Sequence, residues 1–134
     1  MKKRWTQHNS CGNKLKIKVI KLIIDGTLEL WTAWLSSPYS SQINGNPPNY
    51  AGCPTINLNL AYDCIVWCLM NNKQIIVHCI GDQASETFIN LYQEYLAETK
   101  STNNFRPIMI HATTVRNDQL QIMKEIGMTP SFLV

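Results

Sequence analysis

Two of the three histidines in this 134-residue chain stand in the same kind of place. His78 ends the apolar run 74–78, and His111 ends the apolar run 107–111. Both runs have the composition of short buried strands. Side chains at the carboxyl ends of parallel strands meet at one edge of the sheet, so two imidazoles there would converge. Because imidazole is the commonest nitrogen ligand for zinc and related metals, the pattern indicates a metal site. The third histidine, His8, lies in a polar segment and is given no role.

The alternative for His78 and for His111 is a ring that is hydrogen-bonded inside the protein core. The matching positions of the two histidines weigh against that alternative, and the residues alone leave both interpretations open.

A lysine within the strand-like run 16–24 is the third candidate ligand. By the two-residue period of a strand, Lys21 shares a face with Val19 and Ile23. A lysine inside a parallel strand is costly unless its side chain is paired, modified or neutral. The alternative is an edge strand from which Lys21 points to water.

The elements that would position these residues alternate between strands and helices. The predicted strands cover residues 16–24, 74–79, 107–110 and 128–134, and the predicted helices cover residues 57–70, 83–98 and a segment from Asn117 or Asp118 to Gly127. Asp82 is expected to be the N-cap of the second helix, and Gly127 the C-cap of the third. The apolar run 74–79 is expected to be buried on both faces.

Residues 32–54 are rich in Ser, Pro, Asn and Gly and are expected to form one long loop. Loops of this length in small domains are usually functional or disordered. Strands that alternate with helices imply parallel strands and right-handed crossovers, so the predicted fold class is α/β. A barrel and an open doubly wound sheet both fit this order of elements.

The composition, with 45% hydrophobic and 16% charged residues, is that of a soluble globular domain. No apolar stretch approaches the roughly 18 residues that a membrane span needs. The basic start of the chain is followed by polar residues rather than by the hydrophobic segment of a signal peptide, so a cytoplasmic location is expected.

The net charge of +3 is unevenly distributed, because residues 1–24 hold seven of the twelve basic residues and no acidic one. We expect residues 1–15 to form a polar, basic arm and residues 16–134 to form the folded domain. A solvated arm is favoured over a nucleic-acid-binding one, since few aromatic residues interleave with its lysines.

Five cysteines give an odd count, and none belongs to a CxxC pair. Cys64 and Cys68 lie four residues apart on a predicted helix, where they could share a metal ion. Because no second pair has zinc-site spacing, buried reduced thiols in a reducing compartment are the favoured interpretation.

Several motifs together carry a resemblance to a known family. They are Lys-Leu-Ile-Ile-Asp-Gly-Thr-Leu at residues 21–28, Thr-Ala-Trp-Leu at 32–35, Val-His-Cys-Ile-Gly-Asp at 77–82, Arg-Pro-Ile-Met-Ile-His-Ala at 106–112 and Gly-Met-Thr-Pro-Ser-Phe at 127–132. In this order and spacing, residues 17–134 resemble the amidohydrolase superfamily, in its family 3 group of YtcJ-like metal-dependent hydrolases.

The resemblance implies a partial TIM (β/α)8 barrel, covering about strands four to seven, with one or two divalent metal ions, zinc being expected, at its mouth. Lys21 matches a lysine that can be carboxylated into a bridging ligand, and His78 and His111 match the metal histidines of strands five and six. Asp25 and Asp82 lie beside these positions and would support the ligands or cap a helix, with capping expected for Asp82. The implied substrate is a small amide, whose carbonyl the metal would polarise.

The chain also departs from the family pattern. It has no His-x-His pair and no counterpart of the strand-eight aspartate, so no catalytic residue is assigned. Trp31 stands where many relatives carry a small or basic residue. A whole barrel needs about 250 residues, so this chain is expected to supply about half of one, with two unpaired edges.

The sequence therefore predicts a fragment of a metal-dependent hydrolase acting on carbon–nitrogen bonds, inactive alone, whose partner is a second copy or the missing barrel half. One alternative is a truncated, non-enzymatic remnant that dimerises through its open edges. Another is a small α/β ligand-binding module that uses the helix start at Asp82. Neither nucleic acid nor a membrane is expected as a partner.

Overall fold

The computed structural model describes residues 17–41, 45–102 and 104–132. The predicted basic arm, with His8 and Cys11, lies outside these residues. The elements along the chain are β1 (Val19–Ile23), α1 (Leu58–Met70), β2 (Gln74–Cys79), α2 (Asp82–Thr99), β3 (Ile108–His111), α3 (Asn117–Glu125) and β4 (Thr129–Phe132). The predicted alternation of strands and helices is thus confirmed.

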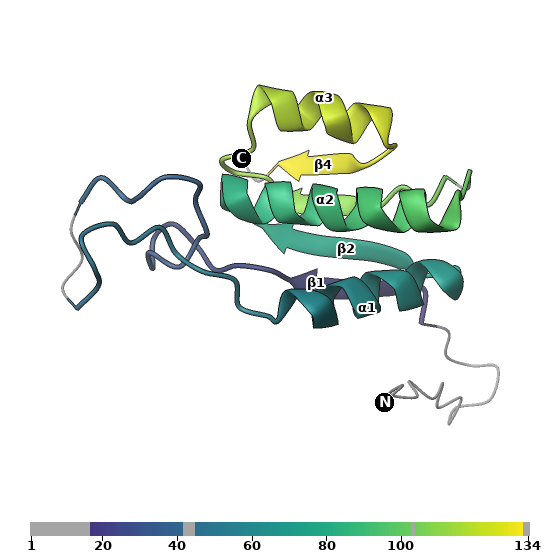
Figure 1. The fold of residues 1–134 in the computed structure, drawn as a ribbon, viewed down its shortest axis with the longest axis horizontal. Coiled ribbons are helices and arrows are strands. Elements are labelled where there is room, and N and C mark those ends of the chain that lie inside the picture. The colour runs from purple at the N-terminus through teal and green to yellow at the C-terminus, as the bar shows by residue number, and fades with distance from the viewer. Residues whose placement is uncertain (1–16, 42–44, 103, 133–134) are drawn as a thin grey trace.

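The four strands form one parallel sheet in the order β1-β2-β3-β4, so each strand pairs with its neighbour along the chain (Figure 1). This is the arrangement of successive units in a (β/α) barrel. The described sheet is open, with β1 and β4 at its two edges. The long loop that was predicted at residues 32–54 is also found, since none of the residues described between β1 and α1 belongs to a helix or strand.

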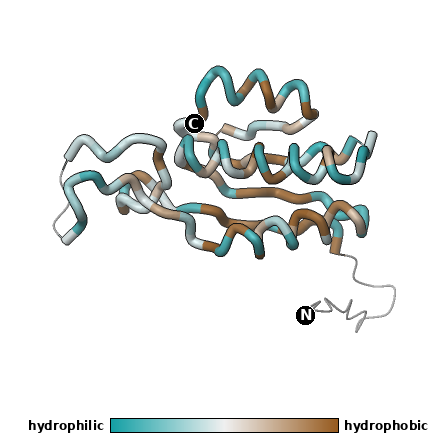
Figure 2. Tube along the Cα trace, in the orientation of Figure 1, coloured by the Kyte–Doolittle hydropathy of each residue, from teal (hydrophilic) through white to brown (hydrophobic). Residues whose placement is uncertain are grey.

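The core lies between the sheet and the helices. Ile75, Val77 and Cys79 of β2 are fully buried in one cluster with residues of all three helices, such as Ile65 and Phe88. Figure 2 shows hydrophobic residues concentrated on β2 and α1, whereas much of the long loop is hydrophilic. Burial of these apolar faces is the main force that holds the helices on the sheet.

The prediction that residues 74–79 are buried on both faces was wrong. Burial alternates along β2, so that Gln74, Ile76 and His78 are only half-buried. The physical reason is that the core covers one face of the sheet, while the other face of the described sheet is open. On β1, Lys21 is exposed on this open face together with Val19 and Ile23, as the two-residue period predicts.

Local signals explain where the helices begin and end. The Asn57 side chain caps α1 by accepting the backbone N–H groups of Asn59 at 3.0 Å and Leu60 at 3.2 Å. After α3 the chain turns away at Gly127, whose φ of +70° is the left-handed conformation that glycine adopts at helix ends. In the described ranges, no helix has both the length and the apolar character that crossing a membrane requires.

Candidate metal centre at the carboxyl ends of the strands

The structure brings His78 and His111 together. Their ring centroids lie 4.6 Å apart, with the ring planes inclined at 68°. Both side chains are half-buried at the carboxyl ends of β2 and β3. The predicted convergence of the two imidazoles is therefore confirmed as geometry.

The strand register alone does not explain why the rings of His78 and His111 are in contact. His78 pairs with Ile110, and His111 pairs with Cys79, so the two histidines are offset by one residue. Regular alternation would place the His111 side chain on the helix-covered face with Met109 and Cys79. Instead the backbone of His111 has a φ of 75°, and Ala112 follows with 46°. This break in the strand conformation explains how the His111 ring reaches His78.

Hydrogen bonds of the residues that follow His111 stabilise its left-handed conformation. Ala112 donates its backbone N–H to the Cys79 carbonyl at 3.0 Å, and Thr114 donates both its N–H and its hydroxyl to the Ile80 carbonyl, at 3.1 and 2.8 Å. Such strain costs about 1–3 kcal/mol and persists only where surrounding contacts fix it. No sequence signal marked this turn, because histidine is not the residue that usually adopts it.

His78 is oriented by a backbone carbonyl. Its Nε2 lies 2.9 Å from the Gly26 carbonyl oxygen and 3.7 Å from Oδ1 of Asp25. A carbonyl oxygen only accepts, so Nε2 carries a proton and donates, which leaves Nδ1 as the His78 ring nitrogen that could bind a metal ion. Metal-binding histidines are oriented in the same way, by a hydrogen bond from the ring nitrogen that does not bind the metal.

The surroundings of His111 favour its neutral form. Burial lowers the pKa of His111, and the charges of His78 and Lys21 lower it further, against a smaller opposing effect of Asp25. A neutral imidazole is the form that binds a metal ion. The effect of Lys21 also places its ammonium group within electrostatic reach of His111.

Lys21 lies on the strand next to His78. Lys21 pairs with Ile76, whereas Ile23 pairs with His78, so Lys21 lies two residues nearer to the amino ends of the strands. It shares the open face of the sheet with His78. The three candidate ligands thus come from three adjacent strands. The two imidazoles are in contact, and Lys21 lies on the neighbouring strand, two residues nearer to its amino end.

These residues fit part of a metal site. Two imidazole nitrogens are a suitable donor pair for a borderline divalent ion. Among the described residues no group of three or more His, Cys, Asp and Glu side chains could hold a metal ion, so a further ligand must be Lys21 or come from elsewhere.

The cysteines do not add ligands. Each of the four cysteines in the described segments is free. Burial raises the pKa of Cys68 to about 11 and raises that of Cys64, while the fully buried Cys79 has a pKa well above its ordinary value. Thiols in this state remain protonated and are poor metal ligands. The interpretation of Cys64 and Cys68 as reduced packing residues is the one that this geometry favours.

Asp25 joins the long loop to the turn between β2 and α2. Its carboxylate is fully buried and accepts three backbone N–H groups, those of Trp34 at 3.0 Å, Ile80 at 3.0 Å and Gly81 at 2.7 Å. A Cβ at Gly81 would lie 1.8 Å from the Trp34 carbonyl oxygen, so the two segments approach as closely as glycine allows. Asp25 therefore ties the backbone that follows His78 to the long loop.

The prediction that Asp82 caps its own helix was wrong. Gly81 is the N-cap of α2, and Asp82 is the first residue of the helix. The Asp82 carboxylate instead accepts the backbone N–H of Ser36 at 2.9 Å, the Ser36 hydroxyl and Nη1 of Arg116 at 3.0 Å. Asp82 thus ties the long loop and the start of α3 to α2.

Arg116 is a structural residue that the sequence analysis did not single out. It forms ion pairs with Asp82 at 3.0 Å, Glu86 at 2.7 Å and Asp118 at 3.1 Å. Gln119, fully buried, donates to the Asp82 carbonyl oxygen at 2.9 Å and to the Glu86 carboxylate at 2.7 Å. Apart from the pair of Arg116 with Asp118, these contacts join residues 30 to 37 positions apart in the sequence, so only the folded chain reveals the network.

We expect the stability of the chain to fall in acid because of Asp82. Burial disfavours the ionised form of Asp82, but hydrogen bonds from Ser36 and Arg116 outweigh burial and lower its pKa below the ordinary 3.8. A carboxyl with a lowered folded-state pKa stabilises the protein above its unfolded pKa, and this contribution is lost as the pH falls through the folded value. Urea unfolding at pH 6 to 3 should show a decline below about pH 4 that is shallower in Asp82→Asn.

The matched control for that measurement is Glu29→Gln, which alters an exposed carboxylate. It should leave the pH profile of the unfolding free energy unchanged. An Asp82→Asn chain with the same acid dependence as the wild type would refute the assignment.

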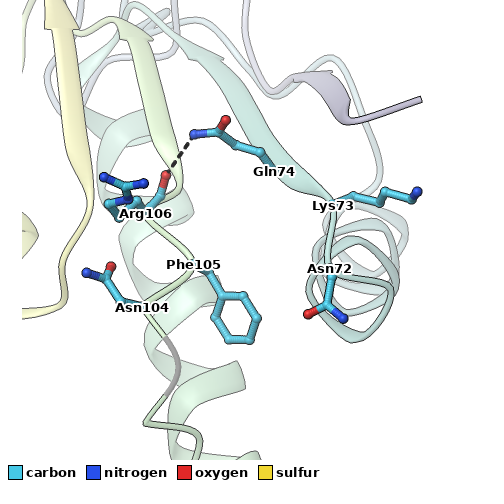
Figure 3. A pocket seen from close by; sticks show the side chains of 6 residues that line it. All are labelled: Asn72, Lys73, Gln74, Asn104, Phe105 and Arg106. Carbon is cyan, nitrogen blue, oxygen red and sulfur yellow. Dashed lines mark hydrogen bonds between the residues drawn. The ribbon is translucent and has the colours of Figure 1, made fainter. Parts of the chain in front are cut away.

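A cavity of about 270 Å³ lies at the other end of the sheet and is not part of this site. Its lining residues are Asn72, Lys73, Gln74, Asn104, Phe105 and Arg106 (Figure 3). These residues lie at the start of β2 and in the segments just before β2 and β3, and Gln74 Nε2 donates to the Arg106 carbonyl oxygen at 3.3 Å. In barrels of this type the amino-end face of the sheet serves stability rather than chemistry.

Comparison with known proteins places this geometry in context. A family model described as "Amidohydrolase family" matches residues 2–134. No curated protein matches the chain. Two solved structures do, and both are described as uncharacterized metal-dependent hydrolases. The one from Pyrococcus furiosus is 32% identical with a TM-score of 0.70, and the match covers 90% of this chain and 23% of that one.

The second structure, from Pyrococcus horikoshii OT3, is 26% identical with a TM-score of 0.68, and the match covers 84% of this chain and 21% of that one. This chain thus spans less than a quarter of the length of each of these proteins. The sheet with its one-sided helices matches part of their fold.

Proposed function

Because the chain belongs to the amidohydrolase family, we propose that it supplies part of the metal centre of a hydrolase that acts on carbon–nitrogen bonds. The observation that carries the proposal is the 4.6 Å contact between the His78 and His111 rings at the carboxyl ends of β2 and β3. In barrels of parallel strands, functional side chains gather at this edge.

In this proposal His78 and His111 bind a divalent metal ion, for which zinc is the preferred candidate because both donors are imidazoles. Lys21 joins them only in a neutral or carboxylated form, because an ammonium group has no lone pair to offer. A divalent ion held there would supply Lewis-acid chemistry, which would activate a water molecule and the carbonyl of a small amide substrate.

The chain's own residues hold and orient the ligands. The Gly26 carbonyl fixes the His78 tautomer, and the left-handed turn at His111 aims the second ring. Asp25 and Asp82 are both engaged, the first with three backbone N–H groups and the second with Ser36 and Arg116. Neither carboxylate is therefore available to move a proton in hydrolysis.

We expect the purified chain alone to hydrolyse none of a panel of simple N-formyl and N-acetyl amides, with zinc or manganese added. The physical reason is that Asp25 and Asp82, the two carboxylates predicted beside the ligands, are held by other partners, so neither can move the proton in hydrolysis. The assay is release of amine above the background of buffer and metal. Metal-dependent turnover that His78→Ala abolishes would contradict this expectation and show that the chain holds a complete site.

A second copy of the chain is the partner that we expect to cover the open face of the sheet. Val19 and Ile23 are 41% and 49% exposed there, and the edges β1 and β4 both have unpaired backbone groups. If β4 of each copy pairs with β1 of the other, two four-stranded sheets close into eight parallel strands.

Sedimentation velocity tests this arrangement. The wild type should have twice the mass of one chain, and Ile23→Lys on the open face should reduce it to a monomer. Glu29→Lys, in the exposed part of the loop, is the matched control. A monomeric wild type would contradict self-association and leave the other barrel half as the partner.

A further inference from the structure

Three aromatic side chains on the loop between β1 and α1 lie against one another. The ring centroids of Trp31 and Tyr39 are 5.1 Å apart in an edge-to-face arrangement, and those of Tyr39 and Tyr50 are 6.1 Å apart and stacked. We call these three residues the aromatic surface. Figure 1 shows that this loop extends beyond the carboxyl ends of the strands, which is the end that carries His78 and His111.

The loop backbone holds the aromatic surface in place. Trp31 has a φ of 56°, a left-handed conformation that is unusual and costly for a bulky residue. Its backbone N–H donates to the Leu28 carbonyl at 3.0 Å. The Tyr39 hydroxyl donates to the Ala33 carbonyl at 2.7 Å, and the Tyr39 N–H donates to the Tyr50 carbonyl at 3.0 Å.

The aromatic surface is anchored to the same residues as the imidazoles. The Gly26 carbonyl accepts from His78, while the Gly26 N–H donates to the Thr32 carbonyl at 3.0 Å, next to Trp31. The Asp25 carboxylate accepts from Trp34 on the far side of that turn. Burial raises the pKa of Tyr39, and the charges of Tyr50 and Asp25 raise it further, which places the Tyr39 hydroxyl within electrostatic reach of Asp25.

The three rings are not a sealed core of the loop. All three side chains remain partly exposed, and the neighbouring Leu30 is 72% exposed. Partly exposed rings in a fixed arrangement provide instead a surface on which another flat or apolar group can stack.

We propose that Trp31, Tyr39 and Tyr50 bind an aromatic or bulky apolar substituent of the amide substrate. The assignment rests on the proposed function, which places the reacting amide at His78 and His111. The surface selects among amides by the group attached to them, and it carries no chemistry of its own. Aromatic rings make apolar and stacking contacts with such groups without requiring a charge.

The test measures the binding of two uncharged probes to the full chain by NMR titration. A chelator is present throughout, so that no metal ion is bound. The probes are N-acetyl-phenylalaninamide and N-acetyl-alaninamide, which differ only by a phenyl ring. We expect the phenyl probe to bind at least tenfold more tightly. Trp31→Ala should abolish this preference, whereas Trp31→Phe should retain part of it.

The matched control is Trp67→Phe on α1, which should leave both affinities unchanged. Equal affinities of the two probes for the wild type, or an unchanged preference in a folded Trp31→Ala chain, would overturn the proposal. The measurement excludes metal, so it separates this proposal from the metal centre. A phenyl preference that survives in His78→Ala supports the surface whether or not the chain retains metal.

Discussion

Replacing both His78 and His111 with alanine is expected to abolish metal retention by the purified chain. The wild type should hold zinc, manganese or iron at close to one ion per assembled site, because two imidazole rings lie side by side at one edge of the sheet. Loss of partners that only orient a ligand already weakens metal binding by about 10–100-fold, so loss of both ligands should weaken it by more than about 100-fold. Elemental mass spectrometry after dialysis measures the bound metal.

The control for that experiment is His8→Ala, which removes the histidine to which the sequence gives no role and should leave the metal content unchanged. Two outcomes would count against the metal centre. One is a cooperatively folded wild type without metal, and the other is a double variant that retains as much metal as the wild type. In either case His78 and His111 would be packing residues in this chain.

Replacing Asp25 with alanine should cause the largest loss of stability of any single carboxylate that the structure describes. Its three hydrogen bonds satisfy the buried backbone N–H groups of Trp34, Ile80 and Gly81. Each buried donor left without a partner costs about 1–3 kcal/mol, so the expected decrease in the free energy of unfolding is on the order of 3–5 kcal/mol. Urea unfolding followed by circular dichroism measures this decrease.

Asp63→Ala is the matched control, because Asp63 is an exposed carboxylate on α1. Its effect should be within about 0.5 kcal/mol of zero. Asp25→Asn should give an intermediate loss, because the amide keeps one acceptor oxygen but turns an NH2 group toward backbone donors. A change of less than about 1 kcal/mol in Asp25→Ala would show that water or a rearranged loop replaces the carboxylate.

The sequence predicted most of the fold because the fold depends on local patterns. The period of apolar residues in 57–70 and 83–98 predicted α1 and α2, and the short branched runs predicted β2 and β3. Alternation of the two kinds of element was enough to predict a parallel sheet. The one-sided burial of β2 was missed, because an apolar run does not reveal whether helices cover one face of its sheet or both.

The candidate site was predictable in its residues but not in its geometry. The matching positions of His78 and His111 indicated that they meet, whereas the one-residue offset and the left-handed turn at His111 appear only in the folded chain. Asp25 was expected beside the ligands, and its role as an acceptor for three backbone groups depends on segments 9 to 56 residues away. Contacts over such distances leave no periodic signal in the sequence.

The order of the strands has a consequence for the chain entropy of folding. Thr129 pairs with Ile108, Ile108 with Ile76 and Gln74 with Val19, so the sequence separation across paired strands rises from 21 to 32 to 55 residues toward the N-terminus. Closing the longest of these loops costs roughly 0.9 kcal/mol more than closing the shortest, and the long segment between β1 and α1 accounts for most of the difference. Pairing β1, the strand that carries Lys21, therefore has the largest entropic cost of loop closure. The strands that carry His78 and His111 are joined by a shorter loop, whose closure costs less.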